Sequence, residues 1–267
     1  MKFCCICGLE QKYISTEKVL KKYDVQYFQC TNCGLIQTED PYWISEAYSD
    51  AIVAMDTGII IRNISIAIRL TALLYVKFSN LKIGLDLAGG YGILTRLMRD
   101  FGYDFYWSDK FCENIVAKGF GINSIMTDKS IEVLTAFEVI EHLVDPLTFI
   151  KSSMEQYNCK TMIMSTVTYD DINLPPDNSW WYYSFKTGQH ISFFHEKTIS
   201  EIAHILKLNY YKISNFYILT DKKIKFNLFD KILIKYTSLI IVYLARNNMG
   251  SKTIKDRDIL EAGKSVA

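Results

Sequence analysis

The sequence carries almost no net charge, because 30 lysines and arginines stand against 29 aspartates and glutamates. A nucleic-acid-binding chain usually has a clear basic excess, so this balance argues against that class and favours a small or uncharged substrate. The N-terminus, MKFCCICG, lacks the continuous apolar segment of a secretory signal, and no run of 18 apolar residues occurs. We therefore expect a cytoplasmic protein.

Apolar residues are plentiful by contrast. They make up 49% of the 267 positions, which is enough to bury a sizeable core. On length alone, one medium-sized domain with an appendage and a pair of domains are equally compatible with the chain.

Four of the seven cysteines form two C-x-x-C pairs, Cys4 with Cys7 and Cys30 with Cys33, and each pair is followed by a glycine. This spacing is typical of a zinc ribbon, since each tight turn presents two thiolates and two turns complete a tetrahedron. The glycine is expected to let the backbone curl so that its amides face the sulfurs. A disulfide or buried free thiols are the alternatives, but a reducing cytoplasm favours zinc. With four protein ligands, the ion is expected to be structural.

Strand and helix patterns alternate from residue 82 onward. Buried strands are expected at 83–87, 105–108, 133–137 and 161–167, and an apolar helical stripe follows the first of them. Such repeats predict an α/β fold with a doubly wound, Rossmann-like, mainly parallel sheet, whose ligand site lies at the carboxyl ends of the strands. The expected organisation is a zinc-ribbon lobe at 1–38, a helical linker or lid at 39–80, the α/β domain at 81–221, and a C-terminal helix and tail at 222–267.

The linker has apolar residues at helical spacing with a break near Thr57-Gly58, which predicts two helices. Arg62 and Asn63 stand among apolar neighbours there, either on a solvated helix face or in contact with a cofactor or substrate. Further on, 228–246 is an apolar helix candidate flanked by basic residues and too short to span a bilayer. It either packs on the sheet or on a second subunit, or anchors the protein to a membrane surface. The polar tail, 251–267, is expected to be frayed or loosely docked.

A glycine cluster separates the first strand from its helix in LDLAGGYG, residues 85–92. Gly89, Gly90 and Gly92 allow a ligand to approach the backbone and the free amides of the helix N-terminus. Asp109, at the end of the next strand, is placed to bind two ribose hydroxyls. Asp86 would repel a phosphate but would orient an ammonium group. The expected ligand is therefore a nucleoside that carries an amino acid.

Together, LDLAGGYG, the acidic residue of FYWSD and AFEVIEHLVDP resemble a class I S-adenosylmethionine-dependent methyltransferase with an N-terminal zinc-binding lobe. DTGIIIRN and WWYYSFKTGQHISFFHEKT resemble a bacterial group associated with surface-polysaccharide and modified-sugar biosynthesis. Ala88 stands where the family's D-x-G-x-G-x-G loop has its first glycine, and its small side chain is compatible with cofactor binding. The resemblance implies that domain 81–221 binds S-adenosylmethionine, and Asp128 is the candidate for the adenine. The implied cofactor-binding residues are Asp86, Ala88, Gly89, Gly90, Gly92, Asp109, Lys110, Phe137, Glu138 and His142.

The long segment after strand 161–167 is the expected acceptor region, since long loops in compact domains are usually functional. His190 is the first candidate for a general base because histidine accepts protons near neutral pH. His142 is the second, with Glu138 and Glu141 beside it. Tyr182 and Tyr183 complete the candidate catalytic set. With the two preceding tryptophans they form either a substrate wall or a hydrophobic plug between the lobes.

Three classes of function follow. The leading one is methyl transfer to a small acceptor, either a sugar nucleotide or another precursor of a capsular or O-antigen glycan, with O-methylation slightly favoured over C-methylation. The second is a nucleic-acid methyltransferase guided by the zinc ribbon, which the charge balance disfavours. The third is a noncatalytic nucleoside-binding scaffold. For the leading class we expect no nucleic-acid partner, and a location in the cytoplasm or at the inner membrane surface.

Overall fold

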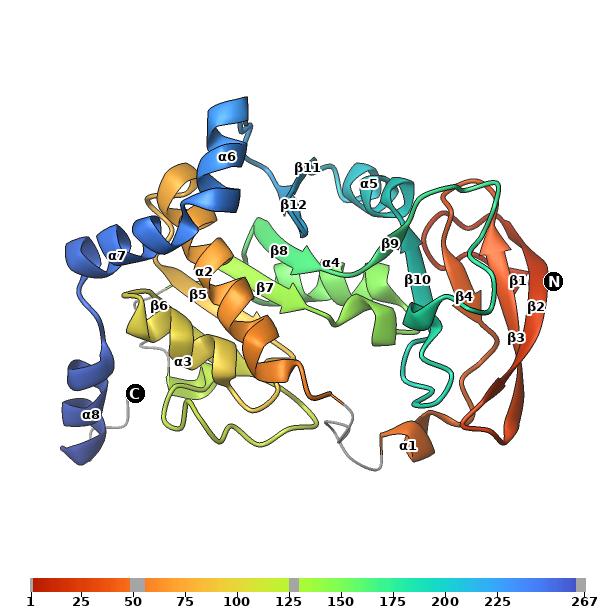
Figure 1. Cartoon of the computed structure of the whole chain (residues 1–267), viewed down its shortest axis with the longest axis horizontal. Coiled ribbons are helices and arrows are strands. Elements are labelled where there is room, and N and C mark those ends of the chain that lie inside the picture. Colours follow the sequence, from red (N-terminus) through yellow and green to blue (C-terminus); the bar gives the residue numbers. More distant parts are fainter. Residues whose placement is uncertain (1, 49–55, 125–129, 263–267) are drawn as a thin grey trace. The chain divides into compact units, whose positions relative to one another are not determined.

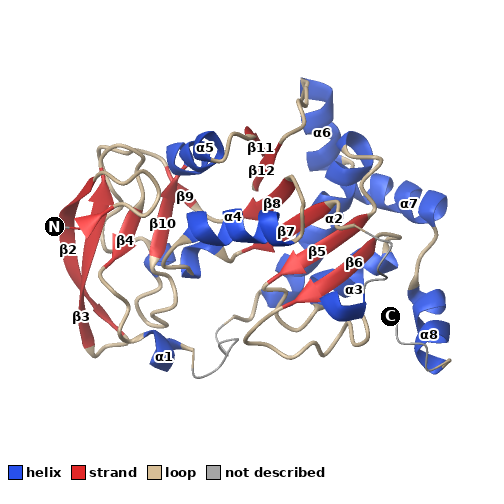
Figure 2. Ribbon diagram, turned by 180° about the vertical axis from the view of Figure 1, so that it is seen from behind, coloured by secondary structure: helices blue, strands red, loops and turns tan. Residues whose placement is uncertain are grey.

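The computed structural model describes residues 2–48, 56–124 and 130–262 (Figures 1 and 2). Its helices and strands form two compact units, each assembled from segments that are distant in the sequence. Unit 1 comprises Met1–Val53, Phe137–Gln156 and Ile163–Asp221, and unit 2 comprises Ala54–Ala136, Tyr157–Met162 and Lys222–Ala267. The division into four consecutive segments stays a prediction.

The zinc ribbon belongs to a six-stranded sheet in unit 1. In spatial order the strands are β1 (Lys2–Phe3), β2 (Glu10–Val19), β3 (Tyr23–Cys30), β4 (Ile36–Thr38), β10 (Ser192–His195) and β9 (Thr168–Tyr169). β10 pairs antiparallel with β4, with Ser192 opposite Gln37. Residues far along the chain therefore extend the ribbon's sheet, which the local cysteine spacing does not indicate.

Unit 1 has five helical elements among the described residues, and the two longest of them begin at a side-chain cap. These elements are α1 (Ile44–Ala47), η2 (Ile140–His142), α4 (Pro146–Gln156), η3 (Trp181–Tyr183) and α5 (Glu196–Ile205). The Asp145 carboxylate accepts the Thr148 amide at 2.9 Å at the start of α4. His195 Nδ1 accepts the Lys197 amide at 3.0 Å, so His195 caps α5 as expected.

The second sheet confirms the predicted Rossmann-like fold. Its strand order is β11 (Asn209–Ile213), β12 (Phe216–Thr220), β8 (Thr161–Ser165), β7 (Val133–Phe137), β5 (Ile83–Leu87) and β6 (Asp104–Ser108). β5 pairs in parallel with β6 on one side and β7 on the other, whereas β11 and β12 are antiparallel. The chain order reverses at β5, and ligands of open α/β sheets bind at such a switch point.

Two helices of unit 2 lie on the same face of β5 and β6. Figure 1 shows α2 (Ile59–Lys77) and α3 (Ile93–Asp100) in front of these strands, and Figure 2 shows the strands in front. α2 is also long and apolar enough to cross a membrane by length and composition, with a mean hydropathy of 1.7 over a window that is 33% buried. Its buried residues include Leu70, Leu73 and Leu74.

The C-terminal helix differs from the prediction, because 228–246 forms two helices rather than one. α6 (Leu228–Tyr236) and α7 (Ser238–Met249) are separated at Thr237. The Thr237 hydroxyl donates to the Leu233 carbonyl at 2.8 Å. A threonine side chain that bonds back to the preceding turn competes with the backbone ladder and favours a helix end.

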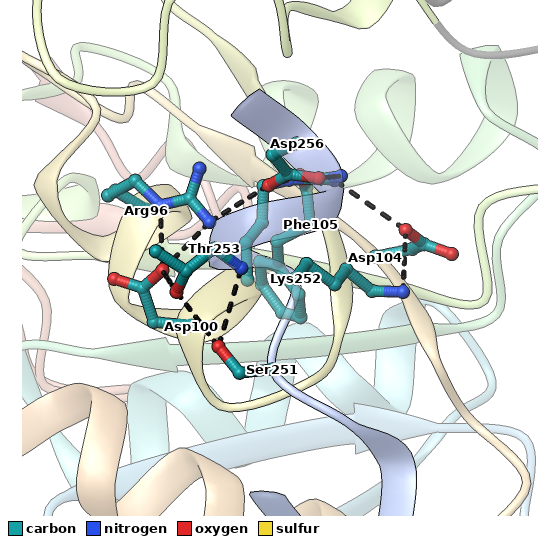
Figure 3. A network of polar contacts seen from close by, with 9 residues as sticks. Arg96, Asp100, Asp104, Phe105, Ser251, Lys252, Thr253 and Asp256 are labelled. Atoms are coloured by element: carbon teal, nitrogen blue, oxygen red, sulfur yellow. Dashed lines mark hydrogen bonds and ion pairs between the residues drawn. The ribbon is translucent and has the colours of Figure 1, made fainter. Parts of the chain in front are cut away.

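The tail is neither frayed nor loosely docked over its described residues. It forms α8 (Thr253–Glu261), and Asp256 is only 2% exposed because Arg99 binds both of its carboxylate oxygens at 2.7 Å. Figure 3 shows the surrounding network, in which Arg96 also reaches Asp256 at 2.8 Å and Lys252 pairs with Asp104 at 3.2 Å. The polar composition suggested exposure, but these charges have partners on β6 and α3.

Candidate active site and metal centre

The four ribbon cysteines converge as the spacing predicts. The sulfurs of Cys4 and Cys33 are 3.6 Å apart, those of Cys7 and Cys30 are 3.4 Å apart, and all four lie within 4.8 Å of one another. A tetrahedral zinc ion with Zn–S bonds of 2.3 Å separates its ligands by about 3.8 Å. The donor set therefore fits Zn²⁺, and its four ligands leave no open position for a substrate.

The glycine after each cysteine pair has a different role from the expected one. Gly8 and Gly34 donate their amides to the carbonyl oxygens of Cys4 and Cys30, at 2.9 and 2.8 Å, and not to the sulfurs. The amides that bind the Cys4 sulfur come from within the turn. Gly34 has φ +85, and a Cβ there would lie 2.7 Å from His195 Cβ. Glycine is required by this left-handed turn and close approach.

The cofactor loop between β5 and α3 is built from left-handed backbone. Ala88, Gly90 and Gly92 have φ values of 51, 54 and 85. Gly89 is needed for space, because a Cβ there would lie 2.8 Å from Trp107 Cδ1 and 2.9 Å from an Asp86 oxygen. Ala88 therefore keeps the loop's conformation but bears a strain that glycine would avoid.

Asp109 holds this loop to the end of β6. Its Oδ2 accepts the Gly90 amide at 2.9 Å, and its Oδ1 accepts the amides of Phe111 and Cys112 at 2.7 and 2.9 Å. Lys110 beside it is exposed. Trp107, which the sequence analysis did not single out, donates its indole N–H to the Gly90 carbonyl at 2.8 Å. Its place two residues before Asp109 in FYWSD is the signal that would have found it.

Asp86 is buried at the end of β5. It is 3% exposed, and its Oδ1 accepts the Thr135 hydroxyl at 2.9 Å. Burial, with a smaller contribution from the charge of Asp109, raises the pKa of Asp86 to about 7. A cation at this position would favour the ionised carboxylate, which suits the ammonium group of an amino acid.

The last residue of β7, Phe137, and the residues that follow it belong to unit 1. The Phe137 ring packs on Phe216 at a centroid distance of 5.1 Å. Glu138 has φ +55, and its Oε1 accepts the Ser165 hydroxyl at 2.6 Å. This contact and the left-handed backbone fix the Glu138 side chain at the carboxyl end of the strand. Asp128 lies outside the described residues.

The two candidate bases lie side by side in unit 1. The rings of His142 and His190 meet edge to face at a centroid distance of 4.8 Å, and ligand atoms of Glu141 and both histidines lie within 4.8 Å of one another. Burial lowers the pKa of His142 to about 3 and lowers that of His190. Burial, then the nearby Glu138 charge, raises the pKa of Glu141 to about 8. Sequence analysis named these residues without predicting that they form one cluster.

The aromatic side chains at 181–183 differ in how deeply they are buried. Tyr182 is 1% exposed and donates its hydroxyl to Glu141 Oε1 at 2.7 Å, so it supports the cluster. Tyr183 is also buried, stacks on Phe185 and donates to the Pro176 carbonyl. Tyr183 thus packs in the aromatic core of unit 1, and a catalytic role for it stays a prediction. Trp181, in contrast, is 72% exposed.

Arg62 and Asn63 on α2 make local contacts. Both guanidinium amino groups of Arg62 bind the Asp56 carboxylate, at 2.9 and 2.5 Å, and Asn63 donates to the Ile59 carbonyl at 2.8 Å. These contacts lie on the first turn of the helix and beside it.

The parallel sheet with a glycine turn after β5 and an acidic residue after β6 defines an α/β protein that binds a nucleoside cofactor. The model of the family described as "Methyltransferase domain" matches residues 63–212, which is more than half of the chain. The chain therefore belongs to this family, and its enzyme class is that of the S-adenosylmethionine-dependent methyltransferases.

Solved structures of similar fold include further methyltransferases. Magnesium protoporphyrin IX methyltransferase from Synechocystis PCC 6803, with bound SAH, is 15% identical over 66% of this chain and 90% of its own, with a TM-score of 0.43. The plantazolicin methyltransferase, in complex with SAH, is 10% identical over 76% of this chain and 90% of its own, with a TM-score of 0.47. No curated protein matches the chain in the sequence comparison.

Proposed function

We propose that the enzyme transfers the methyl group of S-adenosylmethionine to a hydroxyl of a small acceptor, a sugar nucleotide or another precursor of a bacterial capsular or O-antigen glycan. The observation that carries the cofactor assignment is the buried Asp86 carboxylate beside a glycine loop in which Gly89 and Gly90 are partly exposed. The acceptor class rests on the resemblance of DTGIIIRN and of the segment 180–198 to enzymes of surface-glycan biosynthesis.

The residues around the glycine loop have the chemistry that this cofactor needs. The amides at the N-terminus of α3 offer hydrogen bonds to its amino-acid part, and Asp86 offers charge to its ammonium group. The carbonyl oxygens of Gly89 and Gly90 each accept one hydrogen bond within the protein and can accept a second. Asp109 Oδ2 accepts one amide and so has capacity for a further hydrogen bond from a ribose hydroxyl. Lys110, Phe137, Glu138 and His142 remain proposed cofactor contacts. S-adenosylmethionine supplies an activated methyl group on a sulfonium, so the protein has to align the acceptor and remove one proton.

His190 is the proposed general base. Its Nδ1 lies 2.7 Å from the Tyr182 carbonyl oxygen, which only accepts hydrogen bonds, so Nδ1 carries the proton and Nε2 has a free lone pair. In the proposed step, Nε2 takes the hydroxyl proton while the acceptor oxygen bonds to the methyl carbon. The electrons of the S–CH₃ bond go to sulfur, which leaves S-adenosylhomocysteine. His142 is the second candidate, with Nδ1 held by the Gln189 carbonyl at 3.1 Å.

An exposed aromatic surface adjoins this base. The Trp181 ring contacts Tyr182 at a centroid distance of 5.2 Å, and Tyr182 contacts His190 at 4.6 Å. Flat exposed aromatic rings stack on sugars, whose C–H faces are apolar. Trp181 is therefore the proposed platform for a sugar acceptor, which supports a glycan precursor over a purely apolar substrate.

The proposed location is the cytoplasm, at the surface of the inner membrane. α6 and α7 expose large apolar side chains, including Phe229, Leu239 and Tyr243, near the exposed Lys231 and Lys235. A surface that combines apolar and basic residues suits an anionic bilayer. Sedimentation with phosphatidylglycerol vesicles, but not with phosphatidylcholine vesicles, would support this location, and no sedimentation with either would contradict it.

Zinc-loaded protein incubated with S-adenosylmethionine and a panel of nucleotide sugars tests the function, with mass spectrometry detecting the gain of one methyl group. We expect methylation of at least one sugar by the wild type and much less by Asp109→Ala. RNA and DNA oligonucleotides in the same panel test the alternative class. Methylation of nucleic acid alone would overturn the proposed acceptor, and failure to bind the cofactor would favour a scaffold.

A further inference from the structure

The cluster of Glu141, His142 and His190 has more potential metal-ligating groups than general-base catalysis requires. Two imidazoles and one carboxylate place ligand atoms within 4.8 Å of one another. A cation bound at 2.0–2.2 Å by nitrogen and oxygen ligands separates neighbouring ligands by roughly 3.0–3.5 Å. The three ligand atoms therefore lie close enough together to hold one metal ion.

Both histidines are held in the tautomer that metal ligands adopt. His142 Nδ1 lies 3.1 Å from the Gln189 carbonyl oxygen, and His190 Nδ1 lies 2.7 Å from that of Tyr182. Because a carbonyl oxygen is only an acceptor, both Nδ1 atoms carry hydrogen and both Nε2 atoms present lone pairs. A backbone carbonyl on the distal N–H is the usual outer contact of a metal-bound histidine.

Only one of the two carboxylate oxygens of Glu141 has a hydrogen-bond partner among the described residues. The Tyr182 hydroxyl donates to Oε1 at 2.7 Å. Oε2 is buried and has no hydrogen-bond partner among the described residues, in a side chain that is 0% exposed. Buried carboxylate oxygens are rarely left unsatisfied, since the loss of hydration is costly. The orphan oxygen therefore points to a missing ligand beside the two imidazoles.

We propose that Glu141, His142 and His190 bind a first-row divalent cation, distinct from the zinc of the cysteine cluster. A set of two imidazole nitrogens and one carboxylate oxygen suits Zn²⁺, Fe²⁺ or Co²⁺ and leaves coordination positions open. Both histidines are partly exposed, so a cation has a route to the cluster.

This inference rests on the proposed function and deepens it. With the acceptor hydroxyl bound to the cation, the oxygen loses its proton to water more readily, because the cation stabilises the alkoxide. The alkoxide oxygen then bonds to the methyl carbon, and the S–CH₃ electron pair leaves with sulfur. A lone pair of His190 cannot hold a proton and a cation together. In the cation-loaded enzyme the cation therefore activates the acceptor oxygen, whereas in the cation-free enzyme His190 removes the proton as the base.

Cobalt calorimetry on the zinc-loaded full chain tests the proposal. Zinc release is followed in the same samples, so that exchange of Co²⁺ into the cysteine cluster is detected. We expect one Co²⁺ to bind without zinc release. Glu141→Gln, which keeps the side-chain shape and an acceptor for Tyr182, is expected to weaken binding about tenfold or more, and Tyr182→Phe about tenfold through loss of the outer hydrogen bond.

His204→Gln is the matched control, because His204 is an exposed histidine on α5 and lies outside the cluster. It should leave Co²⁺ affinity unchanged. No binding in the wild type, or equal binding in wild type and Glu141→Gln, would overturn the proposed site. S-adenosylhomocysteine affinity measured on the same samples separates the two proposals: retained cofactor binding without Co²⁺ binding rejects the cation alone, whereas loss of cofactor binding rejects the function.

Discussion

The cysteine cluster and the cluster of Glu141, His142 and His190 both have their ligand atoms within 4.8 Å of one another, yet they differ in how the sequence encodes them. The four cysteines come from two short turns, so their spacing in the chain already describes the site. The second cluster combines a turn after β7 with a residue from the long segment before β10. Local spacing thus encodes the cysteine cluster, whereas the assembly of the other cluster depends on tertiary folding.

The largest effect is expected from breaking the cysteine cluster. Cys30→Ser removes one of four ligands, and the zinc ribbon depends on the ion because structural zinc contributes on the order of 10 kcal/mol to the folding of small zinc domains. We expect loss of bound zinc and a fall in unfolding free energy of several kcal/mol, measured by metal analysis and denaturant titration. Cys5→Ser is the control, because Cys5 is outside the set of four, and equal zinc loss in both variants would contradict the assignment.

His190→Gln should lower turnover without changing the zinc content of the cysteine cluster. Removing a general base lowers turnover by about 10²–10⁴-fold, while zinc content and cofactor affinity stay at the wild-type level. Turnover is measured at neutral pH with the methylated acceptor as readout. His204→Gln serves as the control, and full turnover in His190→Gln would show that His190 is not the base.

The stability that Asp86 contributes beside the glycine loop is expected to depend on pH. Burial raises the pKa of Asp86 to about 7 from an ordinary value of 3.8, so the folded protein holds this proton more tightly than the unfolded chain. The associated stability is fully present below pH 3.8 and is lost as pH rises through about 7, an effect of up to about 4 kcal/mol.

Asp86→Asn should flatten this part of the stability profile, which urea titrations at a series of pH values would measure. Asp171→Asn, at an exposed aspartate, is the control. An unchanged profile in Asp86→Asn would show that Asp86 does not titrate in this range.

The smallest expected effect concerns Ala88. Its φ of 51 is left-handed, which costs about 1 kcal/mol for an L-residue and little for glycine. We expect Ala88→Gly to leave stability unchanged or raise it by up to about 1 kcal/mol, with cofactor affinity retained. Thermal unfolding measures the change, and a clear loss of stability would contradict the strain assigned to Ala88.

The sequence predicts those parts of the fold whose signals are local. Apolar periodicity located β5, β6 and β7, and the pattern of cysteines located the ribbon. It did not predict that β10 extends the ribbon's sheet or that α8 docks through Asp256, because both depend on partners distant in the chain. Composition alone does not distinguish a polar helix that docks through one buried ion pair from an exposed tail.

The candidate site follows the same division. Asp86, the glycines and Asp109 were singled out as candidates because they lie at or just after the ends of consecutive strands. Glu141 and His190 were singled out separately, but their shared cluster and the unsatisfied Glu141 oxygen depend on how 141 and 190 meet. Tyr182 and Tyr183 have different partners, which adjacent aromatic residues in a sequence do not reveal: the Tyr182 hydroxyl donates to a carboxylate, and the Tyr183 hydroxyl donates to a backbone carbonyl.

The central claim is that the glycine loop binds S-adenosylmethionine, and calorimetric titration with S-adenosylhomocysteine tests it most directly. Wild type and Asp109→Ala are compared, with Glu113→Ala as a control at a nearby exposed carboxylate. We predict one-to-one binding that is weakened about tenfold or more in Asp109→Ala, from lost hydrogen bonds to a charged group, and unchanged in Glu113→Ala. Absence of binding to folded, zinc-loaded wild type, or equal affinity in wild type and Asp109→Ala, would contradict the account.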